Sequence, residues 1–498
     1  MTAGLKTNLP VFIVVIPMFV AFMLPTFARR IKWIEGTVAA VKLLGLAAAA
    51  WLAHMVLYEK DFPVKYIMGG WPAPWGIELV IGNLAALFIL TIAIVSLPVA
   101  LFARDNLEKE VGPKQRIARF YVLYLLLIGA LAGMAITNDL FNVFVLVEVV
   151  TLSCCGLVSS RKGHGAAKAA FNYLILATLG SALVLGGIGF IYILTGHLNM
   201  EFASAELGRV WQSSPHTVWM ALSFLFVGFG VKAALFPLHV WLPDAHSMAP
   251  SPASALLSGL AIKGYIISFM KILYVIFGHT LMQEYGIYRI LILIGMVAII
   301  IGSLSALLQK RLKRRLAFST VAQVGYLFLG LGLANKEGLM GTLLYLVSHA
   351  VIKSLLFLAA GAVISATGKE NIRDLAGVGR KMPIAMGTFT IASLSLIGLP
   401  LLSGFIGKWH LVLGSLGAGD ILSVAVIIIG SILCAAYLLP IIRIAYFEPA
   451  PEADWQDPGL PQKAALILLA AGVVLLGVLP GPFIELAGRA AAELLLIQ

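Results

Sequence analysis

Long apolar stretches separated by short polar segments recur along almost the whole chain. A helix needs about 20 predominantly apolar residues to cross the hydrocarbon core of a bilayer, and we read fourteen stretches as such spans. The ten-residue alternation that marks a membrane barrel is absent, and lipid cannot satisfy an open backbone. The pattern predicts an all-α polytopic membrane protein. Its predicted spans are 9–27, 36–57, 79–103, 120–137, 140–158, 170–195, 216–237, 252–277, 287–308, 316–334, 339–365, 384–412, 421–442 and 464–484.

Composition agrees with this class and argues against cofactor chemistry. The 498 residues are 60% hydrophobic and only 12% charged. Cys154 and Cys155 are adjacent and Cys434 stands alone, so no disulfide framework or metal spacing is present. No cysteine cluster or dinucleotide fingerprint occurs. We expect no catalytic residue, no metal and no cofactor in this chain.

Basic residues set the expected orientation. The segments after odd-numbered spans hold 22 Lys and Arg and those after even-numbered spans hold five. Lysine and arginine stay on the cytoplasmic side, so both termini are expected on the outer side of the cytoplasmic (inner) membrane. Arg29, Arg30 and Lys32 follow the first span, which we read as a retained helix. The net charge of +12 follows from this orientation, and no nucleic-acid partner is expected.

Seven ionisable residues nevertheless fall inside predicted spans. A charge at the bilayer centre costs about 2.5–3.5 kcal/mol on insertion scales, so such residues are expected to face the bundle interior and to serve transport. Lys42 is close enough to the end of its span to snorkel. The seven are Glu148, Lys232, Lys263, Lys271, His349, Lys353 and Lys408.

Glu148 and Lys232 form the strongest candidate pair. No residue within a helical turn of Glu148 can neutralise it, so its partner must come from another helix. Lys232 lies five residues before Pro237, a residue that breaks helices. Burial disfavours a charged lysine and a nearby carboxylate restores it. A Lys232–Glu148 pair could therefore take up or release a proton as it closes and opens, titrating as one coupled system. A purely structural pair is the alternative.

The remaining residues extend the pair into a row. Lys263 lies in the middle of its span, whereas Lys271 is two turns nearer the outer surface, where snorkelling is an equal alternative. His349 and Lys353 are four residues apart and share one helix face, and histidine can pass a proton between its two nitrogens. Lys408 follows a stretch with one proline and three glycines that is expected to interrupt its span.

Broken helices 7 and 12, each with a lysine near the break, are five spans apart. A five-helix unit reappears inverted in the membrane, and broken helices in corresponding positions of inverted repeats point to an ion site. The predicted organisation is 1–103 (helices 1–3), 104–278 (first repeat, helices 4–8), 286–447 (second repeat, helices 9–13) and 448–498 (loop and helix 14). The copies differ, because helix 10 has no acid matching Glu148.

Several motifs together resemble one known family. They are Asp139-Leu140-Phe141-Asn142 through Glu148, Phe236-Pro237-Leu238-His239-Val240-Trp241-Leu242-Pro243-Asp244-Ala245-His246, Ala249-Pro250-Ser251-Pro252 through Lys263, His349 through Phe357, and Ser403 through Lys408. This set resembles the antiporter-like membrane subunits. They comprise large subunits of Mrp-type cation/proton antiporters, antiporter-like subunits of respiratory complex I, and related subunits of membrane-bound hydrogenases. The similarity covers residues 80 to 450.

The resemblance implies a fold and a role. It implies fourteen core helices with inverted repeats and an axis of buried charges. Glu148 and Lys232 would be the switching pair, Lys263 and His349 the central relay, and Lys408 the terminal carrier, joined by water. Asp139, His239, Asp244, His246 and Lys271 are candidates for the access paths. One departure concerns the lysine that often precedes the tyrosine at the start of span 6, because Asn172 precedes Tyr173 here and Lys168 lies a turn earlier.

Within the family, the expected likeness is to the D subunit of Mrp-type Na+/H+ antiporters. Lysine at 408 resembles that subunit and argues against the middle complex I member, and the absence of a long lateral helix argues against the longest. The leading hypothesis is a subunit of a multi-subunit antiporter that moves H+ and Na+ beside other membrane subunits. The same fold inside a redox-driven pump is the main alternative. A stand-alone solute carrier or a structural scaffold is a third.

Overall fold

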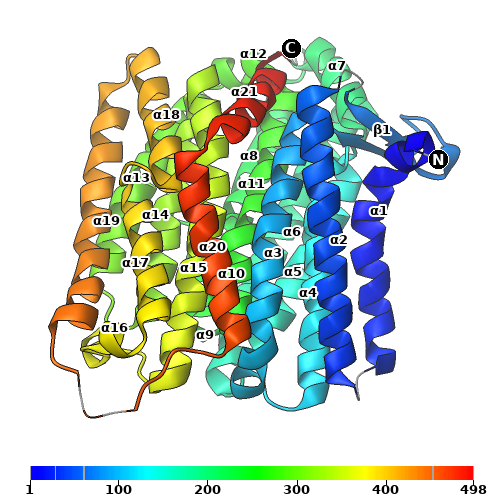
Figure 1. Ribbon diagram of the computed structural model, residues 1–498. Helices are drawn as coiled ribbons and strands as arrows, with labels where there is room; N and C mark the ends of the chain where they lie inside the picture. Colours follow the sequence, from blue (N-terminus) through cyan, green and yellow to red (C-terminus); the bar gives the residue numbers. More distant parts are fainter. Residues whose placement is uncertain (1, 28–29, 60–61, 451, 453, 497–498) are drawn as a thin grey trace.

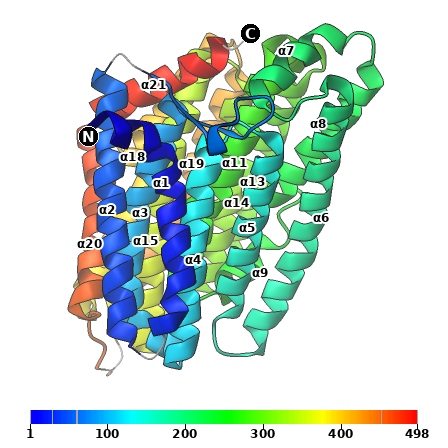
Figure 2. The same ribbon diagram turned by 90° about the vertical axis from the view of Figure 1, so that its right-hand side faces the viewer.

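The computed structural model describes residues 2–27, 30–59, 62–450, 452 and 454–496. It is a bundle of long, roughly parallel helices (Figures 1 and 2). Both ends of the described chain lie at the same end of this bundle (Figure 1). Arg29, one of the basic residues that follow the first predicted span, lies outside the described residues.

Every predicted span contains a helix. The helices of the first half are α1 (Thr2–Met23), α2 (Ile31–Tyr58), α3 (Asn83–Glu110), α4 (Lys114–Ile136), α5 (Leu140–Ser159), α6 (His164–Thr195) and α8 (Pro215–Lys232). Span 8 is built from α10 (Ser251–Leu256), the π-helical turn η3 (Leu257–Ala261), α11 (Ile262–Lys271), a second π-helical segment η4 (Ile272–Phe277) and α12 (Gly278–Glu284). Later helices are α13 (Ile287–Leu307), α14 (Leu312–Gly332), α15 (Lys336–Thr367), α17 (Pro383–Ile397), α18 (Ser403–Gly417), α19 (Ile421–Phe447) and α20 (Leu460–Val478).

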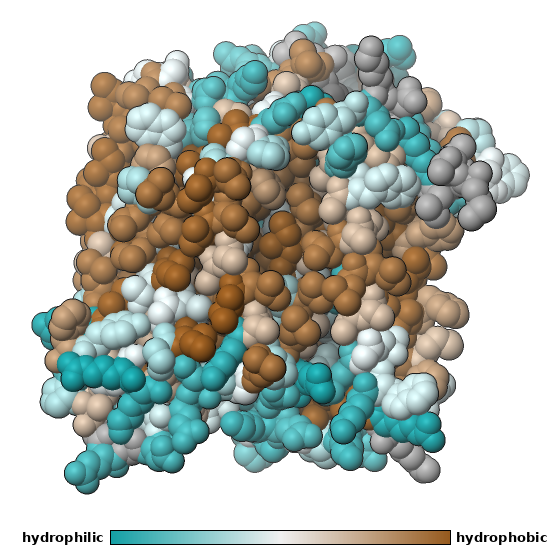
Figure 3. Space-filling model, in the orientation of Figure 1, coloured by the Kyte–Doolittle hydropathy of each residue, from teal (hydrophilic) through white to brown (hydrophobic). Residues whose placement is uncertain are grey.

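Eleven helical stretches in the described part of the chain are long and apolar enough to cross a membrane. The predicted spans that miss this criterion correspond to α8, α14 and the pair α17/α18. Two of these, α8 and α17/α18, are the helices predicted to be broken. A count of fourteen crossings therefore stays a prediction. Figure 3 shows apolar surface across the middle of the bundle and hydrophilic residues at both ends, as expected for a polytopic membrane protein.

Several small elements were not predicted. Strands β1 (Val64–Ile67) and β2 (Glu78–Ile81) form an antiparallel hairpin between α2 and α3. Helix α7 (Met200–Val210) precedes α8, α9 (Leu242–Met248) precedes α10, and α21 (Gly481–Leu496) follows α20. Short helical turns are η1 (Leu24–Phe27), η2 (Met68–Gly70), η5 (Ile372–Leu375) and α16 (Val378–Lys381). All of them are shorter than the about 20 residues that a membrane span needs, so the pattern of apolar stretches does not predict them.

The two predicted breaks exist, but the first falls earlier than expected. Helix α8 ends at Lys232, five residues before the predicted end of span 7. The Val231 carbonyl there accepts hydrogen bonds from Trp241 Nε1 at 2.8 Å and from the Ala234 N–H at 3.2 Å. The second break separates α17 from α18, and Leu401 within it has φ of 69°. Carbonyls and N–H groups freed at such breaks need new partners in lipid, which places polar groups at both sites.

Two basic residues are placed differently from expectation. Lys42 is not at the end of α2: it lies eleven residues from Ile31 and is 5% exposed, so the snorkelling interpretation was wrong. Lys313, counted with a polar segment, is buried beside Glu110, with 3.8 Å between Nζ and Oε1. Glu110 also accepts hydrogen bonds from the N–H and hydroxyl of Ser251, at 2.5 and 2.6 Å. The hydropathy pattern shows how far a residue lies from the end of a span. It does not show which side of a helix packs against another helix.

Close packing of α15 and α18 depends on glycine at position 407. A Cβ built there would lie 2.6 Å from Tyr345 Cα on α15. Gly407→Val is therefore expected to lower the free energy of unfolding by about 1–3 kcal/mol through overpacking. Thermal unfolding of the purified variant measures this. Gly417→Val on the same helix is the control, since nothing lies within 4 Å of its Cβ position, and equal stability of the two variants would contradict the prediction.

Candidate functional site

Glu148 and Lys232 form an ion pair at the end of α8. Lys232 Nζ lies 3.3 Å from Glu148 Oε1, and the lysine side chain is fully buried whereas that of Glu148 is 29% exposed. Ser181 on α6 donates its hydroxyl to the same carboxylate oxygen. The partner predicted to come from another helix is thus Lys232.

Two glycines let α8 pack closely against α6. A Cβ at Gly228, one turn before Lys232, would lie 2.8 Å from the Gly180 carbonyl, and one at Gly180 would be 3.1 Å from the Gly228 carbonyl. Small residues let membrane helices approach closely. The contact holds α8 against α6, where Ser181 directly follows Gly180.

A hydroxyl chain leads from the ion pair toward the bundle centre. Lys232 Nζ donates to Thr151 Oγ1 at 2.6 Å, and that oxygen lies 3.1 Å from the Tyr265 hydroxyl. Lys232 Nζ also lies 5.9 Å from the centre of the Tyr265 ring. Tyr265 is two residues beyond Lys263 on α11. Thr151 and Tyr265 therefore connect the pair to the helix that carries Lys263.

Lys263 and Lys353 are joined through hydroxyl groups of α14. Lys263 follows the π-helical turn η3 and donates to the Ser258 carbonyl, while the Ser258 hydroxyl lies 2.9 Å from Thr320 Oγ1. Lys353 donates to the neighbouring Ser319 hydroxyl and, at 2.9 Å, to the Leu316 carbonyl. Both lysines are fully buried. π-Helical turns are frequent at functional sites, and this one ends two residues before Lys263 and contains the Ser258 carbonyl that the lysine bonds.

His349 is buried beside the two central lysines. It lies close enough to Lys263, Lys353 and Lys408 to interact with their charges, and its ring stacks on Tyr345 at 6.0 Å. Neither ring nitrogen has a hydrogen-bond partner among the described residues. A buried polar atom without a partner costs about 1–3 kcal/mol. A hydrogen bond to water or to a proton-bearing neighbour would remove this cost.

Lys408 ends the row without an acidic partner among the described residues. Its amine donates to the Leu396 and Ile397 carbonyls at 2.9 and 3.1 Å and to Ser431 Oγ at 3.0 Å. The two carbonyls belong to the C-terminal end of α17, where the helix dipole favours a cation. The ring centres of Tyr326 and Tyr345 lie 4.8 and 5.9 Å from Nζ. Aromatic faces attract an ammonium group, so Tyr326 on α14 takes the place of the missing acid.

Both ends of the row reach the surface of the described chain. Glu148 is part-exposed, and Lys408 lines a cavity of about 360 Å³ whose other walls include Phe405, Trp409 and Ile428. Lys263, His349 and Lys353 between them are fully buried.

The candidate access residues fall into two groups. Asp139 caps α5 by accepting from the Asn142 N–H at 2.7 Å, and burial raises the pKa of its carboxyl although N–H donors act in the opposite sense. Lys271 donates to the Thr137 and Ala135 carbonyls at 2.5 and 3.4 Å, just after and at the end of α4. Both contacts serve helix ends, which is a structural task.

The other group lies around α9. Asp244 pairs with Arg314 at 3.1 Å, and both are part-exposed. His246 is fully buried with neither nitrogen bonded in the described part of the chain, and His239 has an unbonded buried Nδ1. Lys168 is exposed at the start of α6, apart from the row.

Sequence reasoning missed the hydroxyl groups of the site. Thr151 could have been found, because it lies three residues after Glu148 and such residues share a helix face. Ser181, Ser319, Thr320 and Ser431 carry no such signal, since a hydroxyl in a membrane helix is common.

The chain is similar in sequence to known membrane proteins. The family model described as NADH:quinone oxidoreductase/Mrp antiporter, TM, matches residues 137–434. NADH-quinone oxidoreductase subunit N of Desulforudis audaxviator is 38% identical, aligned over 95% of this chain and 96% of that protein. The D subunit of the Na(+)/H(+) antiporter of Alkalihalophilus pseudofirmus is 28% identical over 98% and 97%.

A solved structure shares the whole fold. A chain from the membrane-bound sulfane sulfur reductase, an archaeal respiratory membrane complex, superposes with a TM-score of 0.91 at 31% identity and covers 98% of each chain. The matched family region contains every residue of the row from Glu148 to Lys408. The chain belongs to the NADH:quinone oxidoreductase/Mrp antiporter transmembrane family.

Proposed function

We propose that this chain is an ion-translocating subunit of a multi-subunit membrane complex and that it moves protons along the row Glu148, Lys232, Lys263, Lys353, His349 and Lys408. The observation that carries the proposal is the buried Lys232–Glu148 pair, at one accessible end of a row of otherwise unpaired buried amines within the described residues. A structural scaffold has no use for such amines, because each makes the bundle costlier to insert.

The geometry supports a switching role for the pair. While the 3.3 Å contact is closed, the carboxylate favours the charged amine. When it opens, buried Lys232 loses its anion and its proton is free to pass toward Thr151 and Tyr265. Water completes the path where protein groups are too far apart. His349, within electrostatic range of three lysines and lacking hydrogen bonds in the described structure, would accept the proton between Lys263 and Lys408.

The repeat organisation is part of the proposal. Residues 104–278 and 286–447 would be inverted five-helix copies, with 1–103 and 448–498 flanking them. The supporting observation is that the breaks after α8 and before α18 each lie beside a row lysine. The copies differ at their lysines, since Lys232 has a carboxylate partner and Lys408 has carbonyls and tyrosine rings.

The proposed setting is the cytoplasmic membrane, with both termini outside and other membrane subunits beside this chain. H+ and Na+ are the proposed ions, and an Mrp-type antiporter is one parent complex, supported by the relative named as the D subunit of a Na(+)/H(+) antiporter. A redox-driven complex is the second, favoured by the 38% identity to NADH-quinone oxidoreductase subunit N and the 31% identity to the respiratory complex chain.

Purification of the native complex through this chain separates the two parents. Iron below one atom per complex, together with sodium-driven collapse of ΔpH in everted vesicles, would support the antiporter. Stoichiometric iron and proton uptake driven by a reductant would support the redox pump. If the complex moved protons neither on addition of sodium nor on addition of a reductant, that result would contradict the proposed function itself.

His349→Leu tests the relay within this function. We expect about a fivefold loss of proton movement, while thermal stability stays equal or rises because two unbonded buried nitrogens are removed. ΔpH measurements in everted vesicles, normalised to the amount of complex, give the readout. His216→Leu at the start of α8 is the control and should be neutral. Full activity in His349→Leu would remove His349 from the path.

A further inference from the structure

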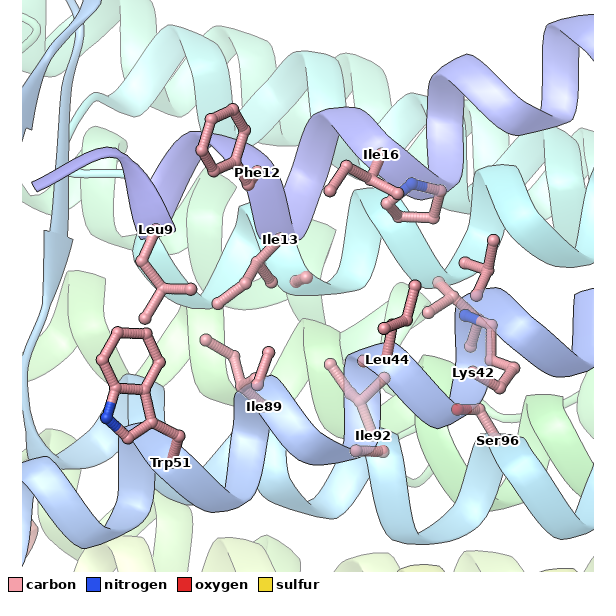
Figure 4. Close-up of a pocket in the computed structure, with 17 residues that line it drawn as sticks. Leu9, Phe12, Ile13, Ile16, Lys42, Leu44, Trp51, Ile89, Ile92 and Ser96 are labelled. Carbon is pink, nitrogen blue, oxygen red and sulfur yellow. The ribbon is translucent and has the colours of Figure 1, made fainter. Parts of the chain in front are cut away.

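A cavity outside the charged row opens between α1, α2, α3 and α4. Its volume is about 320 Å³, and its walls include Leu9 and Phe12 of α1, Trp51 of α2, Ile92 of α3 and Ile128 of α4. All of these are apolar or aromatic. Figure 4 shows Leu9 and Trp51 at one end of the cavity and Lys42 with Ser96 at the other. The cavity is thus an apolar slot with one basic residue at one of its two ends.

The amine of Lys42 lacks an anionic partner. No hydrogen bond or ion pair joins it to any residue that the structure describes, and its one recorded polar interaction is with the Tyr124 ring, 5.4 Å from Nζ. A buried membrane charge is expected to pair with something, and a cation–π contact supplies no negative charge to neutralise the amine. The geometry therefore leaves room, at this amine, for an acidic group from outside the chain.

The depth of Lys42 excludes a phosphate at the headgroup level. Glu35 and Arg104, 3.6 Å apart, join α2 and α3 near the end where α2 begins. Lys42 is seven residues further along α2, which is about 10 Å deeper. The acidic group must therefore be carried into the hydrocarbon region by an apolar body.

The cavity has a volume of about 320 Å³. The slot runs from Lys42 to Trp51, nine residues of helix and about 13 Å. That is long and narrow, which matches one extended alkyl chain.

We propose that this cavity binds a single-chain amphiphile with a carboxylate head, of the long-chain fatty acid class, with its carboxylate on Lys42 and its alkyl chain along Ile92, Phe12 and Leu9. The head then points toward the end of α2 that carries Glu35, and the tail points away from it. An amphiphile of the adjoining leaflet has the same direction, so it can enter without turning over. The Ser96 hydroxyl, at the same end of the cavity (Figure 4), is a second donor for the head.

Binding of oleate to the purified complex tests the proposal, with displacement of the fluorescent fatty acid cis-parinarate as readout. Wild type should bind one oleate per copy of this chain. Lys42→Met should weaken binding at least tenfold and still fold, since it removes a buried charge. Oleyl alcohol, with the same chain but no carboxylate, should also bind at least tenfold more weakly than oleate.

A second variant tests the slot independently of charge. Gly45 lines the cavity and nothing lies within 4 Å of its Cβ position, so the side chain of Gly45→Phe can grow into the slot without displacing protein atoms. It should abolish binding. Lys463→Met on α20 is the matched control and should bind as wild type. Absence of stoichiometric oleate binding in wild type would overturn the proposal. So would equal oleate affinity of wild type and Lys42→Met, or equal affinity for oleate and oleyl alcohol.

Discussion

Glu148→Gln is expected to reduce proton movement by the assembled complex at least twentyfold and to destabilise it. The variant leaves Lys232, whose side chain is fully buried, without its carboxylate. Breaking one side of a buried ion pair costs about 3–5 kcal/mol, because the remaining charge stays uncompensated. Transport should fall further than the loss of stability explains, since the carboxylate of the proposed switch beside Lys232 is gone. Everted vesicles report transport, and the thermal midpoint of the purified complex reports stability.

The double variant Glu148→Gln/Lys232→Gln separates a functional pair from a structural one. Removing both charges relieves the unpaired amine, so stability should return to within about 1 kcal/mol of wild type. Transport should stay as low as in the single variant. If the double variant regained transport, the ion pair would contribute to stability and would have no role in transport.

An exposed pair supplies the control for this test. Arg209 and Glu206 lie 3.1 Å apart with side chains 77% and 34% exposed. Surface pairs of this kind contribute only about 0–1 kcal/mol. Glu206→Gln should leave both transport and the thermal midpoint unchanged.

Lys263→Met is expected to reduce transport at least twentyfold with no loss of stability. The amine is fully buried and donates to one carbonyl, that of Ser258. Methionine keeps the unbranched shape and removes a charge that costs about 2.5–3.5 kcal/mol to insert. Only the proposed path loses a member, because Lys263 bonds Ser258, whose hydroxyl lies 2.9 Å from Thr320 Oγ1 on α14.

Lys271→Met, on the same helix, should show the opposite pattern. Its amine holds the Thr137 and Ala135 carbonyls at the end of α4. Losing these bonds should lower stability by about 1–3 kcal/mol, while transport per folded complex stays within twofold. The same two assays apply to both variants. A transport defect in Lys271→Met as deep as that in Lys263→Met would place Lys271 on the path instead.

The helices and the buried charges could be predicted because both are visible in the order of apolar and charged residues along the sequence. A run of apolar residues identifies a span, and Glu148 or Lys353 inside one has no reason to be there except a protein partner. The break near Lys408 was visible in its proline and glycines. The break after Lys232 was predicted five residues too late. The prediction relied on Pro237 as the helix breaker, whereas the helix already ends before Ala233.

The contacts between helices could not be predicted. Whether Lys42 is buried depends on how α1 and α4 pack against α2, and the hydropathy of the sequence does not contain this information. Lys313 was assigned to a polar segment for the same reason, although Glu110 and Lys313 are joined inside the bundle. Tyr326, which substitutes for an acid beside Lys408, is an ordinary core residue in sequence.

The contact between α21 and α3 has a consequence for biosynthesis. Glu493 accepts hydrogen bonds of 3.0 Å from the backbone N–H and the side-chain amide of Asn83, 410 residues earlier in the chain. At about 5–20 residues per second, a ribosome needs roughly 20–80 s to cover that interval. For this period the start of α3 stands in the membrane without the carboxylate that caps it, and the groove later filled by α20 is open. The packing of α3 is therefore completed only after the last two helices of the chain have been made.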